Sequence, residues 1–321
     1  MIHIGVIGLG SIYKTQKKVL EMLSDRYEVV ATYDVKKETE PTCDSLDSFL
    51  STTPMEAVLI AIPPKEHYVV AKRCIEAGKH VLLEKPAVLS MDELNELYLA
   101  ADEKKVILHI AFHAAFAIDL EWFLRNKENL ATQYGLRKIK RITCGFFDPY
   151  CADSIAKQGK SSLEGSYVDS GVNALSVCER LADISEFESE HHETDFDMNH
   201  IVTSSKTVYS NKDKSREWVI YTGWNRDLNY KCCLLEFEDS GQMVFLEHSR
   251  QRVLLLNDFH DPKNPIDDEN KDYEVLFEDI SLPRLECHYK GVFGDFEKSL
   301  KTRVSNKKKA LEVHRLLLTN V

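Results

Sequence analysis

The chain has 321 residues, 43% of them hydrophobic and 29% charged, with a formal net charge of −11 at pH 7. This composition excludes a disordered chain, a collagen and a coiled coil, and the length favours two domains. An acidic chain repels phosphate backbones, so we expect no nucleic-acid partner. No run of about 18 apolar residues occurs and the N-terminus lacks the pattern of a signal peptide, so we expect a cytoplasmic protein with no membrane partner.

Cysteine and histidine spacing gives no sign of a metal site. None of the eight cysteines forms a C-x-x-C pair, and the twelve histidines are scattered. We therefore expect reduced, mostly buried thiols and no bound metal. The pair His191-His192 is expected in a solvated acidic loop.

Strands and helices alternate through the first third of the chain. We predict strands at residues 2–7, 27–33, 57–62, 79–83 and 105–112, with helices at 11–23, from about 65 to Gly78, and from Ser90 to about 104. The unbroken apolar run at 57–62 is typical of a strand covered on both faces. This alternation predicts a doubly wound parallel sheet, a Rossmann domain at residues 1–117. Its second crossover is short or missing, with one or two helical turns over Leu46–Leu50.

The pattern changes after residue 117. We predict helices at 118–130, 169–182, 289–301 and 306–319, and strands near 136–147 and at 201–210, 215–224, 230–238, 242–250 and 273–279. Many of these strands alternate apolar and polar residues, as in an open antiparallel sheet with one wet face. The sequence thus predicts an α+β domain at 118–321, with a large, mostly antiparallel sheet and a last helix that can pack back on the first domain.

A glycine-containing turn joins the first strand to the first helix. Gly8-Leu9-Gly10 would let the backbone approach a pyrophosphate at the helix N-terminus, although a tight turn is the alternative and Tyr13 replaces the third glycine of the usual pattern. Asp34 ends the second strand, 24 residues after Gly10. Its carboxylate can accept the hydroxyls of an adenosine ribose and repel a 2′-phosphate, which favours NAD. Lys36 and Lys37 leave NADP possible.

Two further motifs end strands at the carboxyl edge of the predicted sheet, where ligands bind in such folds. Ile62-Pro63-Pro64 ends one strand, and His67 in the following helix is expected to shape the loop. Glu84-Lys85-Pro86 ends the next strand. A lysine at this edge can polarise a carbonyl or donate to an alcoholate, and the alternative is a surface lysine before a turn.

A polar pair opens the predicted helix at 169–182. Asp169 and Asn173 are four residues apart and share one helix face, with Tyr167 just before them. Gly171 would allow a cofactor or substrate to approach closely. The alternative is that Asp169 simply caps the helix.

Taken together, these residues resemble the Gfo/Idh/MocA family of nicotinamide-dependent oxidoreductases. The matching pieces, in order, are Ile7-Gly8-Leu9-Gly10-Ser11-Ile12, Pro63-Pro64-x-x-His67, Glu84-Lys85-Pro86, Asp169-x-Gly171, and Tyr289 with Asp295-Phe296. The resemblance implies a Rossmann domain followed by an α+β domain. It also implies sugar-like or polyol-like substrates and homo-oligomers, dimers or tetramers, made through the open sheet.

The resemblance assigns roles to particular residues. The predicted cofactor-binding residues are Gly8, Gly10, Ser11, Ile12, Asp34, Pro63, His67, Glu84 and Lys85, and the predicted catalytic residues are Lys85, Asp169 and Asn173. Lys85 would polarise the reacting oxygen, and Asp169 would be the aspartate of the substrate pocket. The family usually has a histidine as proton carrier where this chain has Asn173, and an arginine before phenylalanine where it has Ala115-Phe116.

We therefore predict an NAD(H)-dependent oxidoreductase that transfers a hydride between the nicotinamide and a sugar-like or polyol-like substrate. The proton carrier could be Lys85 itself, Tyr167, His113 or a water. The alternative from another class is a cofactor-binding sensor or regulatory protein without turnover, which Asn173 favours. A third possibility is NAD-assisted glycoside cleavage.

Overall fold

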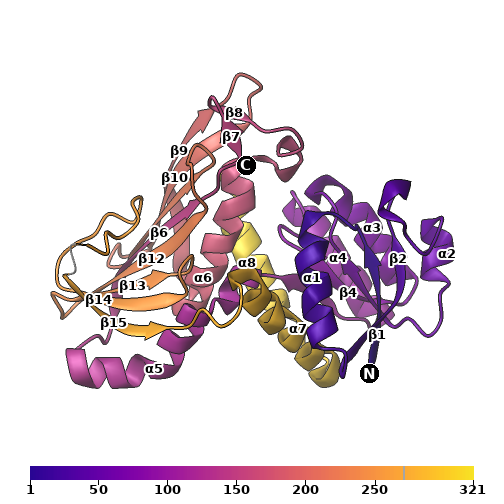
Figure 1. The fold of residues 1–321 in the computed structure, drawn as a ribbon, viewed down its shortest axis with the longest axis horizontal. Helices are drawn as coiled ribbons and strands as arrows, with labels where there is room; N and C mark the ends of the chain where they lie inside the picture. The colour runs from indigo at the N-terminus through magenta and orange to yellow at the C-terminus, as the bar shows by residue number, and fades with distance from the viewer. Residues whose placement is uncertain (270–271) are drawn as a thin grey trace. The chain divides into compact units, whose positions relative to one another are not determined.

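Residues 1–269 and 272–321 are described by the structure, a computed structural model in which the chain forms two units (Figure 1). Unit 1 contains Met1–His113 and Tyr289–His314, and unit 2 contains Ala114–His288 and Arg315–Val321. The two domains predicted at 1–117 and 118–321 stay a prediction. Among the described residues, no helix combines the length and apolar character needed to cross a membrane.

Unit 1 is built on a parallel sheet of five strands in the order β2-β1-β3-β4-β5. Its strands are β1 (Ile2–Ile7), β2 (Tyr27–Tyr33), β3 (Ala57–Ile60), β4 (His80–Glu84) and β5 (Leu108–Ala111). The intervening helices are α1 (Ser11–Met22), η1 (Lys37–Thr39), α2 (Leu46–Leu50), α3 (Pro64–Glu76), α4 (Met91–Lys104) and η2 (His113–Phe116). The predicted parallel sheet is thus confirmed, with α2 as a very short second crossover helix.

Local sequence explains where these helices begin and end. Pro64 occupies the first turn of α3, where its missing N–H is not needed, and Gly78 follows the helix with φ of +74°. Ser90 caps α4 by accepting a hydrogen bond from the backbone N–H of Asp92. All four residues of β3 are buried, as expected for a central strand of a parallel sheet.

The last two helices also contribute to unit 1. They are α7 (Arg284–Thr302) and α8 (Lys307–Leu318). The Tyr27 hydroxyl donates to the carbonyl of Phe293 at 2.6 Å, and the Asn306 side chain pairs with both backbone groups of Ile110. Strands β2 and β5 are therefore fixed by α7 and by the residue that precedes α8.

Unit 2 is built on an eight-stranded sheet in the order β15-β14-β13-β12-β6-β11-β10-β9. The strands are β6 (Ile139–Phe147), β9 (Phe187–Phe196), β10 (Val202–Asn211), β11 (Glu217–Gly223), β12 (Tyr230–Phe237), β13 (Met243–Glu247), β14 (Arg252–Leu256) and β15 (Tyr273–Glu278). The remaining elements are α5 (Ile118–Tyr134), the hairpin β7 (Cys151–Ala152) and β8 (Ile155–Ala156), η3 (Ser161–Leu163), η4 (Tyr167–Gly171), α6 (Val172–Leu181) and η5 (Ile184–Glu186). Only β6 and β11 pair in parallel among the neighbouring strands, so the prediction of a large, mostly antiparallel sheet is confirmed.

Two strands of this sheet differ from the prediction. His191 and His192 were expected in a loop but lie within β9, where His192 donates to or accepts from Thr207 of β10. The single strand predicted at 242–250 is the strand β13 followed by a turn. The next strand, β14, was not predicted.

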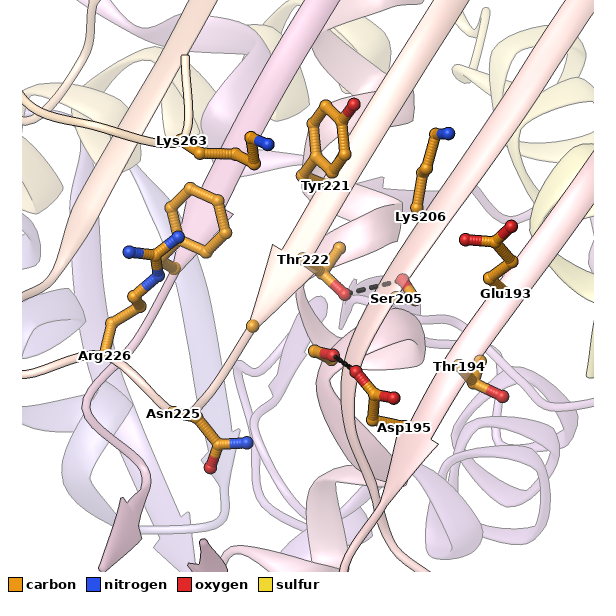
Figure 2. A pocket seen from close by; sticks show the side chains of 13 residues that line it. Glu193, Thr194, Asp195, Ser205, Lys206, Tyr221, Thr222, Asn225, Arg226 and Lys263 are labelled. Carbon is orange, nitrogen blue, oxygen red and sulfur yellow. Dashed lines mark hydrogen bonds between the residues drawn. The ribbon is translucent and has the colours of Figure 1, made fainter. Parts of the chain in front are cut away.

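The face of this sheet opposite α5 and α6 has an apolar part and a polar part. The apolar part centres on Leu234, Phe245 and Leu254, and Ile266 packs on it. The carbonyl of Pro262 accepts a hydrogen bond from the Cys232 thiol, so residues 257–269, which we name the cover segment, lie on this part. The polar part lies over β9, β10 and β11 (Figure 2).

Candidate functional site

The turn between β1 and α1 has the geometry of a phosphate-binding turn. Gly8 has φ of +92°, and a Cβ there would lie 2.4 Å from the carbonyl oxygen of Ala61, so only glycine fits. Gly10 precedes α1 and has nothing within 4 Å of the position its Cβ would take. No side-chain hydrogen bond caps α1, so no capping side chain competes for the first N–H groups of the helix, which include those of Ser11 and Ile12. Backbone N–H groups at a helix N-terminus suit the pyrophosphate of a dinucleotide.

Asp34 lies beside this turn, as predicted from its spacing. Its carboxylate accepts hydrogen bonds from the backbone N–H of Leu9 at 2.7 Å and of Lys36 at 2.8 Å. These two bonds fix the carboxylate at the end of β2 and next to the glycine turn. A carboxylate oxygen has two lone pairs, so each oxygen can still accept a ribose hydroxyl.

His67 joins the two loops that leave β3 and β4. Its ring nitrogens lie 2.8 Å from the carbonyl oxygen of Pro86 and 2.9 Å from that of Ile62, and the ring is fully buried. Burial lowers the pKa of this histidine below its usual value. His67 therefore shapes the edge that carries Pro63 and Lys85, without being exposed to a ligand.

Glu84 lies under the same edge as a buried carboxyl. One of its oxygens, Oε1, accepts hydrogen bonds from the Gln16 amide at 2.7 Å and from the Tyr289 hydroxyl at 2.6 Å. The other accepts from the backbone N–H of Lys85 at 3.2 Å. Burial raises the pKa of Glu84, although these hydrogen bonds and the Lys85 charge oppose the shift. Glu84 was a predicted cofactor residue, whereas Gln16 was not predicted, because nothing in the sequence of α1 marks it as a partner of Glu84.

Lys85 follows this carboxyl at the carboxyl end of β4. Its side chain is half-buried, and its peptide bond to Pro86 is cis. The next N–H, that of Ala87, donates to the Nε2 atom of His314 at 2.8 Å, while the Nδ1 atom of His314 lies 2.7 Å from the carbonyl of Ala310. The lysine-bearing turn is thus anchored on one side by Glu84 and on the other by α8.

Asp169 and Asn173 belong to unit 2, at the junction of η4 and α6. The Asn173 amide donates to the carbonyl of Asp169 at 3.3 Å, which confirms that the two residues share one helix face. Asp169 lies inside the turn of η4 and caps neither helix, so the helix-cap interpretation is wrong. Among the described residues the Oδ1 atom of Asn173 is buried without a hydrogen-bond partner, which leaves an acceptor for a ligand.

Two other expectations for this segment are wrong. A Cβ on Gly171 would lie 3.2 Å from the Tyr167 ring, so this glycine makes room for the protein's own interior and not for a ligand. The Tyr167 hydroxyl lies 2.8 Å from that of Tyr209, donates to the Leu317 carbonyl and accepts from Asn320. Burial raises the pKa of Tyr167. A buried, fully engaged phenol of this kind is unsuited to carry a proton to a substrate.

The structure adds a charged cluster beside Asp169 that the sequence analysis missed. Lys231 of β12 forms an ion pair with Asp148 at the end of β6, at 2.9 Å. Asp148 also accepts hydrogen bonds from Ser170 and Asn229. The lysine within the apolar run Tyr230–Phe237 could have indicated a buried ion pair, because a lysine buried in a strand needs a charged partner.

A second feature, a hollow of about 430 Å³, lies on the polar part of the open sheet face (Figure 2). It is lined by three cations, Lys206, Arg226 and Lys263, and by the carboxylates Glu193 and Asp195. The guanidinium of Arg226 lies 4.8 Å from the Phe147 ring centre, and the ammonium of Lys263 lies 5.3 Å from that of Tyr221. Its charges are mixed, and its side chains come from β9, β10 and β11 and from the loops that carry Arg226 and Lys263.

Unit 1 thus has the fold and the turn of a dinucleotide-binding protein. Residues 2–112 match the family described as an oxidoreductase family with an NAD-binding Rossmann fold. This match confirms, for residues 2–112, the resemblance to the Gfo/Idh/MocA family.

Known proteins resemble part of the chain in sequence and the whole chain in fold. An oxidoreductase of Synechocystis is 48% identical over 63 residues, which cover 20% of this chain and 17% of that protein. The scyllo-inositol 2-dehydrogenase (NADP(+)) of Bacillus subtilis is 30% identical over 116 residues, 34% of this chain and 32% of that protein. The crystal structure of a 3-ketoreductase from Actinomadura kijaniata with NADP and TDP-benzene has a TM-score of 0.78 at 15% identity, over 100% of this chain and 96% of that one. The chain thus matches about a sixth of the first relative's length and about a third of the second's. Its fold is similar to that of the ketoreductase over the whole chain.

Proposed function

We propose that the protein is an NAD(H)-dependent oxidoreductase that acts on a CH–OH group of a sugar-like or polyol-like substrate. The observation that carries the proposal is the pairing of the Gly8–Gly10 turn with the Asp34 carboxylate, which Leu9 holds in place. A sequence relative named as a scyllo-inositol dehydrogenase supports the substrate class.

The residues of unit 1 fit a nicotinamide dinucleotide. The backbone of Gly8, Gly10, Ser11 and Ile12 would hold the pyrophosphate, and Asp34 would accept the ribose hydroxyls. Pro63, His67 and Glu84 would shape the edge on which the nicotinamide half lies. The bound dinucleotide supplies a hydride acceptor or donor.

Each catalytic residue has a separate task in this proposal. Lys85 would hold the reacting oxygen and stabilise the charge that develops on it. Asp169 would bind a neighbouring hydroxyl, and Asn173 would position the substrate through its unpartnered Oδ1 atom. Lys85 is also our first candidate for the proton carrier, because Tyr167 is engaged in the core.

A second candidate function is a cofactor-binding sensor of the same fold that has lost turnover. Asn173 favours it, because an amide cannot carry a proton where the family usually has a histidine. The half-buried Lys85 at the carboxyl edge of the sheet favours the enzyme.

One experiment separates the two functions. A panel of sugars and polyols is mixed with the protein and NAD or NADP, and absorbance of the reduced nicotinamide is followed. Turnover of any substrate supports the enzyme. Tight cofactor binding without turnover on the whole panel would replace the enzyme by the sensor, and no binding of either cofactor would reject both.

A further inference from the structure

The ion pair between Lys231 and Asp148 is unusual because it is almost completely buried. Both side chains are 7% exposed, and Lys231 Nζ lies 2.9 Å from Asp148 Oδ2. The ammonium also donates to the carbonyl of Phe147. Taking two charges out of water is costly, and a well-packed apolar pair is often more stable. Such a pair therefore calls for a role other than stability.

Asp148 connects this pair to the segment that bears Asp169. Its Oδ2 atom accepts a hydrogen bond from the Ser170 hydroxyl at 3.2 Å, and its Oδ1 atom accepts from the Asn229 amide at 2.6 Å. Ser170 directly follows Asp169 in η4. Asn229 in turn accepts a hydrogen bond from Arg284, the first residue of α7, at 3.0 Å. One carboxylate thus fixes both the turn of η4 and the start of α7.

The charge on Lys231 changes at mildly alkaline pH. Burial lowers its pKa to about 8, although Asp148 and Asp169 oppose the shift, and the Arg284 charge adds to it. These groups face the ammonium from the end of β6, from η4 and from α7. Cys232 is its neighbour on β12, and burial keeps the pKa of that thiol above its usual value. Lys231 is therefore positively charged below about pH 8 and neutral above it.

We propose that Lys231 is a positioning residue for substrate binding: its ammonium holds Asp148, and Asp148 holds the Ser170 turn so that Asp169 and Asn173 face the substrate. The inference rests on the proposed function, because it says which residues hold the substrate-binding segment of η4 and α6 in place. In this proposal Lys231 acts through Asp148 and does not itself contact the substrate. Because the charge of Lys231 depends on pH, the position of this segment also depends on pH, which the uncharged Asn173 cannot bring about.

The first test compares pH profiles of kcat/KM between pH 6.5 and 9.5, with a substrate from the panel. Wild type should lose activity above about pH 8. Lys231→Arg keeps its charge over this range and should not show that loss. Lys231→Met should reduce kcat/KM about 10²-fold, the effect expected when a reacting group is misplaced by about 1 Å. Lys140→Met, at an exposed position of β6 in the same sheet, is the matched control and should behave as wild type. An unchanged alkaline loss in Lys231→Arg would overturn the proposal.

The second test needs no turnover, so it separates this inference from the proposed function. In protein labelled with [ε-¹³C]lysine and ¹⁵N-serine, the Lys231 signal is identified by its loss in Lys231→Met, and the Ser170 amide by its loss in Ser170→Ala. Both signals should shift together with a midpoint near pH 8, and Asp148→Asn should lower that midpoint. If the chemical shift of the Ser170 amide does not change as Lys231 titrates, the positioning role is overturned, even in an active enzyme. A coupled titration in a protein without turnover would leave it standing and reject the enzyme alone.

Discussion

In the proposed function, Asp34 is the residue that favours NAD as the cofactor. Its carboxylate is held beside the glycine turn by two backbone N–H groups, so it cannot swing away from an added phosphate. We predict tighter binding of NAD than of NADP, because the carboxylate repels a 2′-phosphate. Titration of the protein with both cofactors measures the two dissociation constants. Asp34→Ser should narrow the difference between the dissociation constants of NAD and NADP. Asp25→Asn, just before the opposite end of β2, removes the same charge and should keep the wild-type difference.

A clearly tighter NADP affinity in the wild-type protein would contradict this assignment. Lys36 and Lys37 would then be the residues to replace, since both follow Asp34 and Lys37 already pairs with Asp44 at 3.3 Å. The NADP named for two of the similar proteins makes this comparison informative.

Lys85 should affect turnover far more than cofactor binding. A donor that acts on charge developing in the transition state affects kcat more than affinity, and its loss costs about 10²–10³ in rate. We expect Lys85→Ala to lose this much kcat with little change in the NAD dissociation constant. Lys104→Ala, on the exposed face of α4, controls for the loss of one positive charge. Unchanged kinetics in Lys85→Ala would show that the active site lies elsewhere.

Asn173 has a buried acceptor atom without a partner among the described residues, which favours a direct role in reading the substrate. We therefore expect Asn173→His to raise KM, because the imidazole alters the position of that acceptor. Steady-state kinetics across pH 5–8 test this. The opposite result, faster turnover with a new dependence near a histidine pKa, would mean that asparagine is only a tolerated substitute for the usual proton carrier.

At the scale of elements, α8 anchors the lysine-bearing turn through one buried histidine. His314 accepts the Ala87 N–H with Nε2, and burial lowers its pKa to about 4. The unfolded chain takes up this proton near pH 6.5, whereas the folded protein does so only near pH 4. The folded state therefore binds fewer protons in this window, and its stability falls as the pH drops from 6.5 to 4.

We predict that this one group removes up to about 3 kcal/mol of the free energy of unfolding across that window. Urea denaturation at pH 7 and pH 5 measures the difference. His314→Gln should weaken the pH dependence, because glutamine can accept the Ala87 N–H without titrating. His200→Asn, at an exposed turn, should keep the wild-type dependence. The interpretation fails if His314→Gln shows the full wild-type loss.

The sequence predicted those elements whose signal is local. The apolar run of β3 and the Pro64 start of α3 are two such signals. Signals of this kind predicted the parallel sheet of unit 1 and its main helices. The strand β9 was missed because it is a polar edge strand, held by backbone pairing with β10 and with few apolar residues of its own. The turn between β13 and β14 was missed because His248–Gln251 contains neither glycine nor proline.

The same distinction explains the candidate site. The glycine turn and Asp34 follow a spacing rule, so their proximity could be predicted from the chain. The Lys231–Asp148 pair could not, because its members are distant in sequence and meet only through the pairing of β12 with β6. Contacts of this kind depend on strand order, which no local pattern encodes.

At the scale of the whole molecule, the sheet of unit 2 bears on self-association. The apolar part of its open face is covered by the chain's own cover segment, and the part over β9–β11 is polar and of mixed charge. We still predict a homo-oligomer, now through this polar part, where opposite charges can pair across a two-fold axis. Light scattering at micromolar concentration should show a multiple of 36.8 kDa, and a species of 36.8 kDa alone would contradict it. Glu193→Lys, which makes the hollow uniformly more basic, should weaken the assembly.

Unit 1 is assembled from two stretches of chain, and this has a consequence for how the protein is made. The Tyr289 hydroxyl, the Phe293 carbonyl and the His314 ring complete hydrogen bonds to residues of the first hundred. On a ribosome the Rossmann strands emerge first, yet these partners follow some 200 residues later. The hydrogen bonds that anchor the lysine-bearing turn therefore cannot form until most of unit 2 has been synthesised. Contacts so distant in sequence close late and slow folding. We therefore expect chaperones to bind the exposed strands of unit 1 during translation and to improve the yield of folded protein.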